Sequence, residues 1–129
     1  MELSEIQSRI LSPFVDETIK ALDTMAGLKA TAGAGFRDDP LKFKFKGYAV
    51  VAETSGAING KILMHHYAET ALAIGNKVRE LALGEPSVAT EIDEEIGEAL
   101  AEFGNTAIGL ATRSLTDRKS TRLNSSHRP

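Results

Sequence analysis

The stretch from Ile92 to Leu115, IDEEIGEALAEFGNTAIGLATRSL, decides the fold that we expect for this chain. Its apolar residues recur every three or four positions, which is the spacing of one face of an α-helix. A long helix is therefore predicted from about Ile92 to Leu115, with one buried face. The residues of this face are Ile92, Ile96, Leu100, Phe103, Ala107 and Leu110.

A second row of residues follows the same helix on another flank. It consists of Glu91, Glu95, Glu98, Glu102 and Asn105, also three or four positions apart. At 100° per residue, Glu102 and Asn105 lie about 60° from each other around the helix axis, so both side chains can act on one object. Spacing alone also fits a solvated acidic face, because a Glu-x-x-Asn pair is an unspecific pattern.

Three glycines interrupt this helix, at positions 97, 104 and 109. Each destabilises a helix by roughly 1 kcal/mol relative to alanine, so a compensating contact is expected. Gly97 and Gly104 are seven residues apart and predict close packing against another helix. Gly109 continues the row of Glu102 and Asn105 and leaves open surface beside Asn105, where another backbone can approach.

Working outward, the chain before this helix predicts a first helix and a hairpin. Ser12-Pro13 is a favourable helix start, and Gly27 ends the apolar spacing that follows it. Residues 48–53 and 58–67 predict two antiparallel strands with a turn at Ser55-Gly56.

A second helix is predicted from Ala68 to Leu83. Gly84 would end it, and the residues expected to point inward are Leu72, Val78 and Leu81.

Composition restricts the class of protein. The chain has 129 residues, which suggests one domain. It has no cysteine, which fits a reducing cytoplasm and excludes thiolate metal sites and cysteine nucleophiles. We find no signal peptide and no membrane span. The net charge of -3 argues against nucleic-acid binding.

The last residues differ in character from the rest. Asp117 to His127 read DRKSTRLNSSH, without apolar periodicity. The string resembles the conceptual translation of a common sequencing adapter. We therefore interpret residues 1–116 as an incomplete domain and 117–129 as a non-native tail, irregular or a frayed helix end, that packs against nothing. If these residues form a strand in the central sheet, this interpretation is wrong.

Two other patterns in the sequence do not predict a binding site. Gly33-Ala34-Gly35 lacks the preceding strand and the lysine of a phosphate-binding loop. His65 and His66 are neighbours on a predicted strand, so they point to opposite faces and cannot easily bind one metal. No metal site is expected.

A wider resemblance gives the Glu-x-x-Asn pair a meaning. SGAINGKI (residues 55–62) and AETAL (68–72) resemble the hairpin and helix start of CheX. IDEE (92–95), Gly97 and EFGN (102–105) resemble the key helix of the CheC/CheX/FliY chemotaxis phosphatases, and SPFV (12–15) resembles the first helix. The resemblance covers about residues 12–115, in order. Glu98 departs from it, because that position is usually Asp or Ser.

The resemblance implies an α/β fold with helices packed on one face of an antiparallel sheet. Further strands should follow the third helix, and we expect these C-terminal strands to be missing here. The implied activity is hydrolysis of the aspartyl phosphate of a CheY-like response regulator in chemotaxis or two-component signalling. Asn105 would orient a water, and Glu102 would bind the receiver's active-site lysine.

The remaining implications concern partners. Glu98 and Gly109 would contact the receiver, which would also supply Mg²⁺, so that the chain needs no cofactor of its own. Two alternatives remain open. One is a non-catalytic CheX-like module that binds a receiver or another signalling protein, and the other is a dimerisation domain without a receiver partner. A homodimer is compatible with the phosphatase and with both alternatives.

Overall fold

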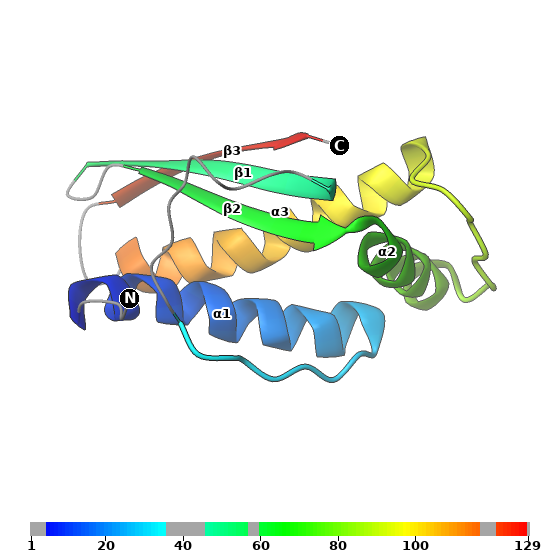
Figure 1. Cartoon of the computed structure of the whole chain (residues 1–129), viewed down its shortest axis with the longest axis horizontal. Coiled ribbons are helices and arrows are strands. Elements are labelled where there is room, and N and C mark those ends of the chain that lie inside the picture. The colour runs from blue at the N-terminus through cyan, green and yellow to red at the C-terminus, as the bar shows by residue number, and fades with distance from the viewer. Residues whose placement is uncertain (1–4, 36–45, 57–59, 117–120, 129) are drawn as a thin grey trace.

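The computed structural model describes residues 5–35, 46–56, 60–116 and 121–128 of the chain. They form three helices and three strands (Figure 1). In chain order these are α1 (Glu5–Ala26), β1 (Gly47–Gly56), β2 (Gly60–Tyr67), α2 (Ala68–Leu83), α3 (Glu94–Thr116) and β3 (Thr121–Arg128).

The sheet has the order β2-β1-β3, and both pairs of neighbouring strands are antiparallel. Val50 in β1 is paired with Met64 of β2 on one side and with His127 of β3 on the other. Side chains alternate along β1, so Tyr48, Val50 and Ala52 join the buried core. β1 is thus the central strand and carries the core face of the sheet.

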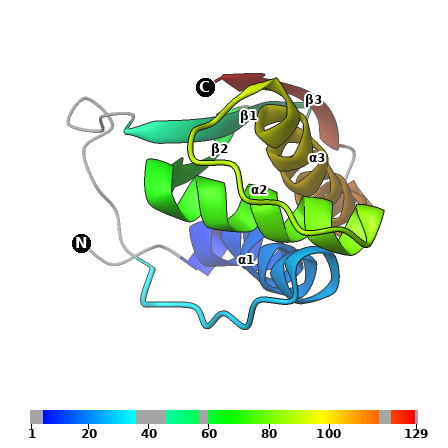
Figure 2. The ribbon, with the colours of Figure 1, turned by 90° about the vertical axis from the view of Figure 1, so that its right-hand side faces the viewer.

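The helices form two levels on one side of this sheet. Figures 1 and 2 show α2 and α3 next to the sheet, with α1 packed on them from the far side. The predicted fold class, helices on one face of an antiparallel sheet, is therefore confirmed.

The core is built around α3. Phe103, Ile96 and Leu100 of this helix are fully buried, and Phe14 of α1 and Ile74 of α2 close the core from the other side. Because burying one such side chain stabilises the fold by about 1.5–3 kcal/mol, α3 is the element that the other layers hold most firmly.

The predicted buried face of α3 is right in its first half and wrong at Leu110, which is 40% exposed. The face drifts around the helix because 3.6 residues per turn do not divide evenly into steps of three or seven. Ile108, Ala111 and Leu115 continue it instead.

A similar correction applies to α2. Its predicted bounds and its end at Gly84 are confirmed, and Gly84 has the positive φ of 70° that glycine adopts readily. Val78 is buried and Leu72 is partly buried against the core, but Leu81 is 57% exposed. The buried face of α2 is formed by Ala71, Ile74 and Val78, and Leu81 lies at the edge of this face.

The first helix starts earlier than Ser12. α1 begins by Glu5 and continues through Pro13, which lies inside the helix. Proline lacks the N–H that would bond to the carbonyl of Arg9, so the helix continues at the loss of one hydrogen bond. The predicted end is confirmed, since Gly27 follows Ala26 with a φ of 65°.

The hairpin is longer than predicted. β1 runs through Ser55 and Gly56, which are strand residues rather than the turn. Residues 57–59, where the connection must lie, are outside the described part of the chain.

The prediction that residues 117–129 pack against nothing is wrong, and so is the expectation that no strand follows the third helix. Thr121–Arg128 form β3 and pair with β1 along its length. Strand pairing uses backbone N–H and C=O groups, and β1 without β3 would leave a row of them open. Residues 117–120 and Pro129 lie outside the described residues. The interpretation of residues 117–129 as a non-native tail is therefore not confirmed.

Gly104 lets α3 approach the sheet. A Cβ at this position would lie 2.6 Å from Cγ2 of Val50 and 3.1 Å from its Cβ. Gly97 is also on the sheet side, where its carbonyl accepts a hydrogen bond of 3.1 Å from the Tyr48 hydroxyl. The glycines were expected to face another helix, and the structure places them against β1.

His66 of β2 lies under α3. Its ring centroid is 6.0 Å from that of Phe103, and its Nε2 atom is buried without a hydrogen-bond partner among the described residues. Burial, with a smaller contribution from the charge of His65, holds the pKa of His66 below its ordinary value.

We expect Gly104→Ala to destabilise the protein, because the new methyl group overlaps the buried and inflexible Val50 side chain. Overpacking of this kind typically costs about 1–3 kcal/mol and should outweigh the helix propensity gained. The control is Gly109→Ala, where a Cβ meets nothing within 4 Å. It should raise stability by up to about 1 kcal/mol. Urea unfolding of both variants measures this, and equal shifts would contradict the packing argument.

We expect His66 to make stability depend on pH in mildly acidic solution. Above the pKa of an unfolded histidine, about 6.5, the ring is neutral in both states and stability is complete. As pH falls below 6.5, the unfolded chain binds a proton before the folded one, because burial lowers the folded pKa. Stability should therefore fall there and level off below the folded pKa.

The measurement is the urea midpoint between about pH 7.5 and 5.5, for wild type and His66→Leu. The substitution keeps an apolar side chain against Phe103 and removes the titrating ring. It should flatten the slope, and an unchanged slope would show that another group causes it.

Candidate functional site

Glu102 and Asn105 are both exposed on α3, one helical turn apart. Between them in sequence lie Phe103 and Gly104, which are buried. The buried residues hold the helix against the sheet and α2, so the two polar side chains project from a backbone that is fixed from behind. Their exposure on one side of the helix is as predicted.

The surface beside this pair is open. Glu98 is exposed one turn before Glu102, and a Cβ added at Gly109 would meet no atom within 4 Å. A second protein can therefore come close to Asn105 without meeting a large side chain at Gly109.

Side-chain hydrogen bonds hold the start of α3 and the connection that leads to it. Asp93 accepts a hydrogen bond from the Ile96 amide through Oδ1, at 2.9 Å, which makes it the N-cap of the helix. Upstream, the Asn76 side chain of α2 accepts hydrogen bonds from Ser87 Oγ (2.7 Å) and from the Ala89 amide (3.0 Å), and donates one to the Ala89 carbonyl (3.0 Å). Together they set where α3 begins and which residues face outward.

A shallow groove of about 290 Å³ runs between α2 and α3, and Glu98 and Glu102 are part of its wall. The other residues that line it are Val78, Arg79, Ala82, Leu83, Glu95 and Ala99. Arg79 Nη2 lies 2.6 Å from Glu95 Oε2. Sequence reasoning missed Arg79, although its place one residue after the buried Val78 is compatible with the edge of the α2 face.

The two neighbouring histidines lie on opposite faces of β2 and make different contacts. His66 packs on Phe103, whereas His65 accepts a hydrogen bond of 3.0 Å from the Lys46 amide and contacts Tyr67 edge-on. Within the described part of the chain, no three His, Asp or Glu side chains are placed to hold a metal ion.

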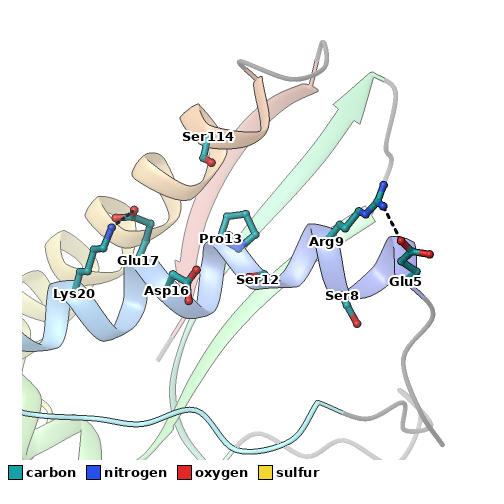
Figure 3. A pocket seen from close by; sticks show the side chains of 9 residues that line it. All are labelled: Glu5, Ser8, Arg9, Ser12, Pro13, Asp16, Glu17, Lys20 and Ser114. Atoms are coloured by element: carbon teal, nitrogen blue, oxygen red, sulfur yellow. Dashed lines mark hydrogen bonds and ion pairs between the residues drawn. The ribbon is translucent and has the colours of Figure 1, made fainter.

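Two other hollows among the described residues are lined by neither Glu102 nor Asn105. Figure 3 shows one of about 540 Å³ along α1, lined by charged and hydroxyl side chains and by Ser114 of α3. An ion pair between Arg9 and Glu5 spans 2.6 Å within it. An apolar hollow of about 310 Å³ lies between α1 and β2. The site pair therefore lines neither of these two hollows.

No helix among the described residues is both long enough and apolar enough to cross a membrane. No protein-family model matches the chain, and no curated protein matches it in sequence.

Several solved structures, among them CheX and CheC-like proteins, match the fold of this chain. CheX from Desulfovibrio desulfuricans superimposes with a TM-score of 0.71 at 23% identity, over 92% of this chain and 73% of that one. A CheC-like superfamily protein from Shewanella sp. PV-4 gives a TM-score of 0.68 at 23% identity, over 93% and 82%. The CheX-CheY-BeF3-Mg²⁺ complex from Borrelia burgdorferi contributes a match with a TM-score of 0.66 at 20% identity, over 91% and 72%. The chain thus has the fold of the CheX and CheC-like chemotaxis proteins.

Proposed function

We propose that this chain is a CheX-type phosphatase of the CheC/CheX/FliY family that hydrolyses the aspartyl phosphate of a CheY-like receiver domain. The observation that carries the proposal is the exposed Glu102–Asn105 pair on the helix where the sequence resemblance expects it. The fold likeness to CheX, and to a CheX recorded in complex with CheY, supports the same partner.

Asn105 suits the task of holding an attacking water. A carboxamide both donates and accepts hydrogen bonds, so it can orient a water in line with the phosphorus atom. It does so without adding negative charge beside an anionic phosphoryl group. The water attacks phosphorus, the bond to the receiver's aspartyl oxygen breaks, and inorganic phosphate and a free aspartate result. No covalent intermediate on this chain is needed.

Glu102 suits a second task, which is docking. Its carboxylate is exposed on the same side as Asn105 and can pair with the lysine in the receiver's active site. Such a charged pair gains strength when the interface excludes water. Glu98 and Gly109 would lie within the contact, with the open surface at Gly109 admitting the receiver's backbone.

The Mg²⁺ that neutralises charge on the transferring phosphoryl group would be held by the receiver. The contribution of this chain would then be the placement of one water and one carboxylate on a rigid helix. Positioning of this kind can supply a large part of a rate enhancement.

We expect Asn105→Ala to lower the rate of phosphate loss from a phosphorylated receiver by about 100-fold while leaving docking nearly unchanged, because the side chain would touch only the water. The assay follows dephosphorylation of a pre-phosphorylated receiver with Mg²⁺, beside a binding measurement. Thr106→Ala, at the next exposed position of α3, is the matched control and should retain the wild-type rate.

In the same assay Glu102→Ala should weaken docking as well as turnover, since it removes the charge that meets the receiver lysine. Equal rates for wild type and Asn105→Ala, with docking intact, would favour the non-catalytic receiver-binding module. Absence of both docking and turnover in the wild type would leave the dimerisation domain as the better description.

A further inference from the structure

Arg79 introduces a positive charge among the glutamates next to the site pair. It is on α2, and its side chain is 26% exposed. The groove that it lines is also lined by Glu95, Glu98 and Glu102 of α3. These three carboxylates lie on one flank of the helix because they are three and four residues apart.

The ion pair holds this charge in a defined place. Arg79 Nη2 is 2.6 Å from Glu95 Oε2, and the Glu95 side chain is 66% exposed. The arginine is therefore much less exposed than its partner, and its guanidinium is fixed in the groove rather than free in solvent. Glu95 is the carboxylate it neutralises, which leaves Glu98 and Glu102 as the charges presented to a partner.

We propose that Arg79 is a positioning residue that compensates charge in the docking groove and thereby favours a receiver that carries a phosphoryl group. This inference rests on the proposed function. A phosphorylated receiver brings an anionic group to the surface where three glutamates stand together. One fixed cation beside them reduces the repulsion, while Glu102 stays available for the receiver lysine.

The ion pair allows an unusually direct test, because its two members can be removed separately. Arg79→Gln and Glu95→Gln break the same bond between α2 and α3, but they change the charge of the groove in opposite directions. If the bond only ties the helices together, both variants should act alike. If charge is the function, they should act oppositely.

The probe is a CheY-like receiver activated with beryllium fluoride and Mg²⁺, compared with the same receiver without them. We expect Arg79→Gln to weaken binding of the activated receiver about fivefold at low salt, and Glu95→Gln to bind it at least as tightly as wild type. The double variant should bind nearly as wild type does. All differences should shrink at high salt, because exposed charges are screened.

Arg9→Gln is the matched control. It breaks an ion pair of the same 2.6 Å length and changes the net charge equally, but on α1, in a hollow that shares no residue with the groove. It should leave binding unchanged. Arg79→Lys keeps the charge and should bind within about twofold of wild type, which covers the case in which Arg79→Gln does not fold.

Three results would overturn the inference. Equal weakening by Arg79→Gln, Glu95→Gln and the double variant would assign the pair a structural role alone. Equal weakening by Arg79→Gln and Arg9→Gln would mean that only total charge matters. If the wild type neither binds nor dephosphorylates the receiver, the proposed function fails and this inference fails with it, whereas the first two results leave the proposed function standing.

Discussion

The close contact between Gly104 of α3 and Val50 of β1 is the constraint on which the rest of the structure depends. With no Cβ at position 104, the helix axis lies near enough to the sheet for Phe103 and Leu100 to be fully buried beside it. A helix held this way has a fixed inner face, and its outer face is then fixed too. The buried residues of the inner face therefore determine the direction in which Glu102 and Asn105 project.

In the same arrangement, the residues of α3 that stabilise the fold and the residues that are open to a partner lie on different faces of the helix. The inner face of α3 is apolar and packs against β1, α1 and α2. The outer face carries Glu98, Glu102 and Asn105, none of which is needed to fill the core. Substitutions on the outer face can therefore change partner chemistry with small effects on folding. A binding surface on a preorganised helix would have this advantage over one built in a loop.

Much of this could be predicted from the sequence, for reasons visible in particular residues. The bounds of α2 followed from its apolar spacing and from Gly84, and the exposure of Glu102 and Asn105 followed from the spacing of α3. The early start of α1 could not be predicted, because the local preference of Pro13 for a helix start is overridden in the folded chain. Leu81 and Leu110 were misassigned because apolar character alone does not tell the centre of a buried face from its edge.

Features that depend on distant partners were also beyond a reading of the sequence. Gly97 and Gly104 signalled close packing, but nothing in their spacing distinguishes a strand from a helix as the neighbour. Arg79 lies in the groove with Glu98 and Glu102 because α2 and α3 are side by side. β3 forms on the edge of β1 through backbone groups, which an alternation of side chains does not reveal.

The three hydrogen bonds of Asn76 bear on how homologous chains can differ in length. They clamp Ser87 and Ala89 to α2, so the exposed residues Gly84 to Pro86 form a closed bulge outside the clamp. An insertion in that bulge changes the loop and leaves α3 as it is. An insertion between Ala89 and the N-cap Asp93 instead falls in the short non-helical connection of residues 90–92, which hydrogen bonds hold at both ends. The clamp thus divides the connection into an exposed part, where extra residues meet little, and a part that is held at both ends.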